Sequence, residues 1–195
     1  LNAALFYTDY DDLQITVQEG VDSDGDGVGD NFVTSVLNAG KATIQGLELE
    51  MEALLSENLT MTLTVGSLDT EIDEFISGGV DIADQTDISN TPDLTSHLAF
   101  AYSRDFGDYG SVVVNTAWSY RSEVQIFETE SVLDPGGYTL WDAGVTYYSS
   151  DEHWTVGLYG KNLTDKEYRV AGYNFPTLGA EGSVIGYYGD PRTVT

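Results

Sequence analysis

Hydrophobic residues recur at every second position over several long stretches, and this alternation restricts the fold more than any other feature of the sequence. Between Leu47 and Ala53 they alternate with glutamate, and between Leu59 and Val65 they alternate with threonine. Further alternating stretches begin at Leu94, Val112 and Trp154, and weaker ones begin at Leu1 and Tyr138. Because successive side chains of a β-strand point to opposite faces, each stretch predicts a strand with one apolar and one polar face.

The length of these stretches and of their connections points to a membrane. Several stretches reach about ten residues, the length that a tilted strand needs to cross a bilayer, whereas an ordinary strand has about 5–6. Short connections at residues 56–58, 104–110 and 149–153 alternate with long ones at 19–34, 70–92, 127–137 and 164–186. Short turns at one rim and long loops at the other are the layout of an outer-membrane barrel.

The two faces of the predicted strands support the same interpretation. The glutamates that follow Leu47 could not be buried without partners, so the polar face meets water, which in a barrel fills the lumen. Tyr102, Tyr147, Tyr148 and Trp154 lie beside the short turns, where a barrel carries an aromatic girdle at the membrane interface. The alternative is that these rings belong to the core of a soluble β-sandwich.

Composition excludes several classes of protein. A net charge of −26, from 33 acidic and 7 basic residues, argues against nucleic acid as a partner, because binding to phosphates needs clustered Lys and Arg. There is no cysteine, hence no disulfide and no cysteine-ligated metal, and no apolar run is long enough for a transmembrane helix. Two interpretations of the acidic excess stay open: solubility through self-repulsion, or an acidic lumen and acidic loops that attract cations.

Four motifs resemble those of TonB-dependent receptors, and they occur in the family's order over essentially the whole chain. They are the stretch from Asn38 to Glu50 with its Gly46-Leu47-Glu48 core, then Asn90-Thr91-Pro92, then Asn162-Leu163-Thr164-Asp165-Lys166-Glu167-Tyr168-Arg169, and finally Gly189-Asp190-Pro191-Arg192. The third is similar to the family's last-loop motif, and the fourth to the start of its closing strand. The third and fourth together are quite specific.

The resemblance implies an all-β fold: about eight antiparallel up-and-down strands of a larger transmembrane β-barrel of about 22 strands. Residues 1–195 would be its C-terminal portion, because both ends look like cuts; the plug domain and the segment that contacts TonB would then be absent. The implied location is the outer membrane of a Gram-negative bacterium. The implied partners are outer-membrane lipid, TonB through the missing N-terminal region, and a small-molecule ligand such as a siderophore.

The implied activity is TonB-dependent uptake of a scarce nutrient, most commonly a ferric siderophore, with cobalamin, haem, nickel complexes and oligosaccharides as other ligands of the family. We find no nucleophile elbow, zinc-binding helix or phosphate loop, and therefore expect no enzyme. Two other functions stay open: a passive porin-like channel without a plug, and a secreted calcium-binding all-β module that folds by itself in water.

One long connection resembles a calcium-binding loop. Asp22, Asp24 and Asp26 stand at alternate positions with a glycine after the third, as in the first half of an EF-hand loop, and Asp30 takes the ninth position. The twelfth position is Val33 rather than glutamate, so the helix–loop–helix version is not supported. The sequence predicts either a calcium loop or a flexible acidic loop without an ion, and no other cofactor.

The sequence does not predict a specific binding site at the remaining polar residues. His97 is expected to line the lumen as an ordinary polar residue, and Glu48, Glu50, Arg121 and Glu123 are expected to face the transport path without forming a recognisable site. The second long connection carries Glu71, Asp73, Glu74, Asp81, Asp84 and Asp87. It is either a rim that attracts cations or a solvated acidic loop.

Overall fold

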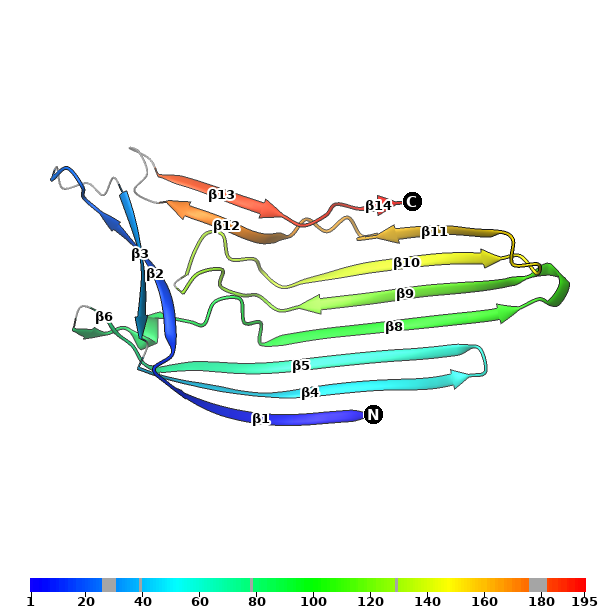
Figure 1. Ribbon diagram of the computed structural model, residues 1–195, viewed down its shortest axis with the longest axis horizontal. Helices are drawn as coiled ribbons and strands as arrows, with labels where there is room; N and C mark the ends of the chain where they lie inside the picture. Colours follow the sequence, from blue (N-terminus) through cyan, green and yellow to red (C-terminus); the bar gives the residue numbers. More distant parts are fainter. Residues whose placement is uncertain (26–30, 39, 78, 129, 176–181) are drawn as a thin grey trace.

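The computed structural model describes residues 1–25, 31–38, 40–77, 79–128, 130–175 and 182–195. Its main element is an eight-stranded antiparallel sheet, in which every strand pairs with the next sheet strand along the chain (Figure 1). In order these are β1 (Asn2–Asp11), β4 (Lys41–Ser56), β5 (Leu59–Glu74), β8 (Leu94–Asp105), β9 (Ser111–Arg121), β10 (Tyr138–Tyr148), β11 (Thr155–Lys161) and β14 (Thr193–Val194). The predicted all-β, up-and-down architecture of about eight strands is confirmed.

The two rims of the sheet differ as the connection lengths predicted. The β4–β5, β8–β9 and β10–β11 turns lie at one rim (right in Figure 1), and the long connections lie at the other. The β8–β9 turn contains a short 3-10 segment, η2 (Gly107–Tyr109). In the β10–β11 turn, the Ser149 hydroxyl and the backbone N–H of His153 donate to Asp151 and hold the pKa of that carboxyl below its usual value. This turn is therefore closed by a charged acceptor.

The long connections contain structure that the sequence pattern did not predict. Three of them form two-stranded hairpins: β2 (Gln14–Val21) with β3 (Asn31–Asn38), β6 (Ile76–Ser77) with β7 (Val80–Asp81), and β12 (Arg169–Phe175) with β13 (Ser183–Tyr188). The second also carries the 3-10 segment η1 (Ala83–Gln85). The single run expected from Leu1 to Val17 is divided at Asp12, whose φ of 58° turns the chain out of the sheet. The strand expected to run from Val112 to Ile126 ends at Arg121.

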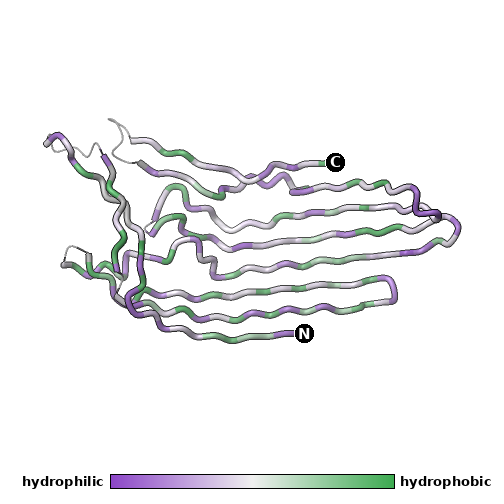
Figure 2. Tube along the Cα trace, viewed as in Figure 1, coloured by the Kyte–Doolittle hydropathy of each residue, from purple (hydrophilic) through white to green (hydrophobic). Residues whose placement is uncertain are grey.

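Strand register places the alternating residues on two distinct faces. Met51, Leu63, Leu98, Trp118 and Trp141 form one cross-strand row, in which the two indoles stack with their centroids 6.1 Å apart. Figure 2 shows the alternation of hydrophilic and hydrophobic residues along these strands. Since paired residues of an antiparallel sheet share a face, the alternating apolar residues lie on one side of a single layer, and Phe6, Leu68 and Leu140 are among the exceptions on the other side.

No second layer among the described residues covers this apolar face. Val114 is 41% exposed, Val145 37% and Trp118 36%, although they stand in β9 and β10, each of which has a paired strand on both sides. An apolar face of this extent in water marks a surface that meets lipid or another protein. The described residues therefore do not form the two-layer sandwich of the secreted-module alternative. No helix among them is long and apolar enough to cross a membrane.

The buried apolar residues gather instead at the rim of the long connections. Ile15, Ile72 and Phe75 form a cluster, with Phe75 fully buried. Partly buried residues that pack against it come from β3, the β5–β8 connection and the residues just before β2. The long connections are thus anchored to the end of the sheet by a hydrophobic core of their own.

Candidate functional site

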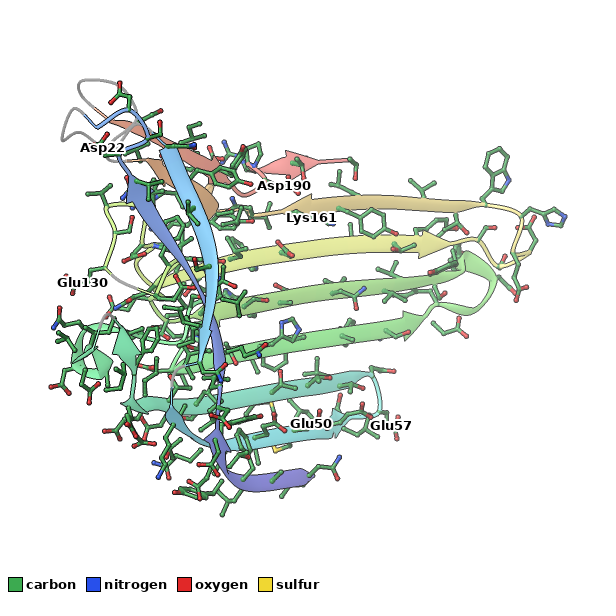
Figure 3. All side chains as sticks on the ribbon, turned by 60° about the vertical axis from the view of Figure 1, so that its left-hand side comes forward. Asp22, Glu50, Glu57, Glu130, Lys161 and Asp190 are labelled. Atoms are coloured by element: carbon green, nitrogen blue, oxygen red, sulfur yellow. The ribbon has the colours of Figure 1, made fainter. Side chains whose placement is uncertain are left out.

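A cavity of about 700 Å³ lies between two long connections at this rim. One wall comes from the end of β5 and from residues 87–93, and the other from residues 123–125 and 130–136. Figure 3 shows Glu130, one of the lining residues, at the same end of the molecule as Asp22 and opposite Glu57 in the β4–β5 turn. The volume is within the range of small-molecule sites, about 300–1,000 Å³.

Hydrogen bonds join the two walls directly. The Gln125 amide donates to Asp87 across 2.6 Å, and the backbone N–H of Asp87 donates to the Glu128 carbonyl across 2.9 Å. A third bond, 2.8 Å long, runs from the Asn90 N–H to the Gln125 carbonyl. Because main-chain groups make two of the three bonds, the cavity has a defined shape that does not depend on a single side-chain rotamer.

The cavity lining is strongly acidic. Asp87, Asp93, Glu123, Glu130 and Asp134 contribute carboxyl groups, and none of the described lining residues is Lys or Arg. Ile88, Val124 and Val132 add apolar surface. A concave wall of one charge sign focuses its field, so this cavity attracts cations and disfavours anions.

Two acidic residues of the second long connection accept hydrogen bonds that stabilise its fold. Asp81 accepts hydrogen bonds from the backbone N–H groups of Phe75 and Ala83, both 3.1 Å long, and Asp73 accepts one from Thr43. Asp87 alone of the six acidic residues predicted there lines the cavity. All six acidic residues of this connection are nevertheless exposed, as a solvated acidic connection requires.

The polar face of the sheet carries a second group of sequence-predicted residues. Register brings Glu48 into one cross-strand row with Arg121, and Glu50 into the next row with His97. His97 forms a 2.9 Å hydrogen bond with Ser119, as expected of an ordinary polar lining residue. Arg121 holds its guanidinium 5.2 Å from the ring centroid of Tyr138. These residues share one face, as predicted, but they do not converge on a common point.

Of the predicted calcium loop, which spans residues 22–33, the structure describes residues 22–25 and, in β3, residues 31–33. Asp22 accepts a 2.6 Å hydrogen bond from the backbone N–H of Gly25, whose φ of 82° makes the sharp turn that glycine allows. Asp24 belongs to the same turn, whereas Asp26 and Asp30 lie outside the described residues. Within the described part of the chain, no three His, Asp or Glu side chains are grouped to hold a metal ion.

The motif that begins at Asn162 ties three parts of the molecule together. Asn162, only 4% exposed and with a φ of 47°, donates to the carbonyls of Lys166 and Asp190 across 2.9 and 3.1 Å, and accepts from the Lys166 N–H. Asp165 pairs with Arg192 at 3.6 Å. The Tyr168 ring packs 4.6 Å from that of Tyr138. These contacts attach the last connection to β10 and to the start of the closing strand.

The comparison with known families decides what kind of sheet this is. The family described as "TonB dependent receptor-like, beta-barrel" matches residues 1–163, most of the chain. The chain belongs to this family. TonB-dependent receptors are transport receptors rather than enzymes, and membership implies the outer membrane.

A curated relative and several solved receptors are similar to the chain. The ferric-pyoverdine M114 receptor PbuA of Pseudomonas sp. (strain M114) is 27% identical over 164 residues, which cover 80% of this chain and 18% of the relative. The ferric yersiniabactin uptake receptor FyuA of Yersinia pestis has a TM-score of 0.71 at 21% identity, covering 98% of this chain and 26% of its own. The siderophore receptor PiuA of Acinetobacter baumannii has a TM-score of 0.65 at 18% identity, covering 98% and 24%.

The structural similarity at these identities establishes the barrel fold, and the chain spans about a quarter or less of the receptors it matches. The site residues that sequence reasoning missed are those that join TonB-dependent receptor loops to one another: Gln125, Leu133 and Arg169. Gln125 continues the alternation that begins at Val112, which predicted only a polar strand face for it, and Leu133 follows no period and belongs to no motif. Arg169 is the last residue of the motif that begins at Asn162, which was its one signal.

Proposed function

We propose that this chain forms the C-terminal third or so of the barrel of an outer-membrane receptor that takes up a ferric siderophore with energy passed through TonB. The observation that carries the proposal is the membership of residues 1–163 in the TonB-dependent receptor family. A relative named as a ferric-pyoverdine receptor supports the ligand class. In this proposal the apolar face of the sheet meets lipid, the polar face lines the lumen, and the rim with the acidic cavity is extracellular.

The test uses the full-length receptor in its own bacterium under iron limitation. Deletion of the gene should abolish uptake of ⁵⁵Fe supplied as ferric pyoverdine or as another ferric siderophore that the strain uses, and the plasmid-borne gene should restore it. Loss of TonB should have the same effect as deletion. Uptake that persists without TonB would favour the passive-channel alternative, and iron uptake unchanged by the deletion for every siderophore used would contradict the ligand class.

The lipid-facing assignment makes a prediction about two neighbouring residues. Leu98→Arg is expected to lower the free energy of unfolding of the receptor in lipid by about 2–4 kcal/mol, because Leu98 lies on the apolar face near the middle of β8 and a charge there enters the hydrocarbon. His97→Arg, one position away on the polar face, is the matched control and should have little effect. Equal losses for both variants would contradict the assignment of the faces.

We also propose that calcium orders the connection that contains Asp22, Asp24, Asp26 and Asp30. Its sequence supplies carboxylates at the first, third and fifth positions of a calcium loop, and an extracellular site needs a Kd of only about 10⁻⁴–10⁻³ M. Calcium titrated into the full-length receptor in a calorimeter is expected to release heat, and the double variant Asp22→Asn/Asp24→Asn should release none. Asp84→Asn, in another acidic connection, is the control. If calcium releases no heat with the wild-type receptor, the proposed calcium site is contradicted.

A further inference from the structure

The segment from Glu130 to Gly136 has two sides with different neighbours. One side lines the acidic cavity through Glu130, Ser131, Val132 and Asp134. The other side lies against the β12–β13 hairpin, none of whose described residues lines the cavity. This segment is therefore a wall that separates the cavity from the hairpin.

Leu133 holds the wall on the hairpin by filling a space that Gly172 leaves open. Its side chain is only 3% exposed. A Cβ on Gly172 of β12 would lie 2.6 Å from the Leu133 Cδ1 atom, and a Cβ on the paired Gly186 of β13 would lie 3.5 Å from its Cδ2 atom. The absence of a side chain at Gly172 thus creates the space for Leu133, whereas a Cβ on Gly186 would only make an ordinary van der Waals contact with it.

Arg169 holds the backbone of the same segment. Its guanidinium donates to the carbonyls of Val132 and Asp134, on either side of Leu133. The Asp134 carboxylate folds the segment from within, accepting from the N–H groups of Ile126 at 2.9 Å and Ser131 at 2.7 Å. A main-chain turn, two charge-assisted bonds and one buried leucine together fix the position of the wall.

We propose that the ligand binds in the acidic cavity and that the β12–β13 hairpin positions the cavity wall through Leu133 and Arg169, so that the hairpin sets ligand affinity without lining the cavity itself. The contacts of Leu133 and Arg169 with the wall and the hairpin are called the clamp below. The clamp follows from the structure alone, whereas the identity of the ligand rests on the proposed function. Both are positioning residues: their side chains act through the wall. If loss of the clamp leaves the wall in place for a tenth of the time, the apparent Kd rises tenfold.

The first measurement needs no ligand. Hydrogen exchange is followed in the full-length receptor, in peptides that report the Ile126 and Ser131 amides. Leu133→Ala and Arg169→Met are expected to speed exchange there at least tenfold. Arg169→Lys should give an intermediate rate, because the lysine ammonium can replace one of the two hydrogen bonds of the guanidinium but not both. Ile185→Ala, on the exposed face of the hairpin, and Arg104→Met, at the opposite rim, are matched controls. Unchanged exchange in Leu133→Ala and Arg169→Met would overturn the clamp.

The second measurement uses ferric pyoverdine as the probe. Its Kd for the receptor should rise about tenfold in Leu133→Ala and Arg169→Met, with an unchanged denaturant midpoint for the barrel, and should recover partly in Arg169→Lys. Faster exchange with an unchanged Kd would overturn the link between the hairpin and the ligand. A wild type that binds no ferric siderophore would contradict the proposed function, and the clamp would then be judged on exchange alone.

Discussion

Asn162→Ala is expected to lower the free energy of unfolding of the full-length receptor by about 3–5 kcal/mol. Three hydrogen bonds of the Asn162 side chain are lost at a site that is only 4% exposed, which leaves the Lys166 and Asp190 groups without their partner. In addition, residue 162 has a φ of 47°, and this left-handed conformation is more strained for alanine than for asparagine. The measurement is denaturant unfolding of the receptor in detergent micelles.

Two further substitutions separate the causes. Asn162→Gly removes the same hydrogen bonds but accepts the positive φ, so it should recover about 1–2 kcal/mol relative to alanine. Asn162→Asp keeps the acceptor for the Lys166 N–H and loses both donations. It also sets a carboxylate oxygen against the carbonyls of Lys166 and Asp190 at a site only 4% exposed, so at neutral pH its loss should be at least as large as that of the alanine variant. A loss below about 1 kcal/mol in Asn162→Ala would show that the motif does not hold the closing strand as the geometry implies.

Phe75→Ala is expected to destabilise the long-connection rim by about 3–5 kcal/mol. Phe75 is fully buried in a cluster with Ile15 and Ile72, so alanine removes the whole phenyl ring and leaves a cavity in the rim core. Because this core joins the β2–β3 hairpin to the end of the sheet, hydrogen exchange should accelerate in β2 and β3 while β8 and β9 stay protected.

The control for Phe75 is its neighbour in the chain. Ile76 is 49% exposed, and Ile76→Ala should change the free energy of local opening by less than about 0.5 kcal/mol. Equal acceleration of exchange in both variants would mean that the rim core does not anchor the hairpin. Loss of protection throughout the sheet in Phe75→Ala would mean that rim and barrel unfold as one unit.

The strands were predictable because their signal is local. Alternation from Leu47 to Ala53 and from Leu59 to Val65 defines two strands and both of their faces, and a turn of only two residues defines their pairing. The lengths of the connections likewise predicted the two rims. The strand ends were less predictable: alternation continues past Arg121 to Ile126, yet the Asn90 and Asp87 backbone groups bond to residues 125 and 128 and draw this segment into a loop.

The candidate site was predictable only in part. Asp87 was identified as an acidic loop residue and Glu123 as a residue of the transport path, but nothing in the sequence placed them around one cavity. Residues 164–186 were expected to be a long connection, and the sequence pattern did not predict the β12–β13 hairpin, in which Gly172 pairs with Gly186. The structure explains why position 172 is a glycine, since Leu133 occupies the space that a side chain there would need.

The sequence by itself determined the class of fold, the two faces of the sheet, the order of the strands and the resemblance to TonB-dependent receptors. All of these rest on patterns that repeat every second residue or on motifs of a few consecutive residues. Only the tertiary structure decided how the long connections fold onto one another. Arg169 meets Val132 across 37 residues and Gln125 meets Asp87 across 38. Such contacts have no period, because they depend on where several independent chain segments arrive together in space.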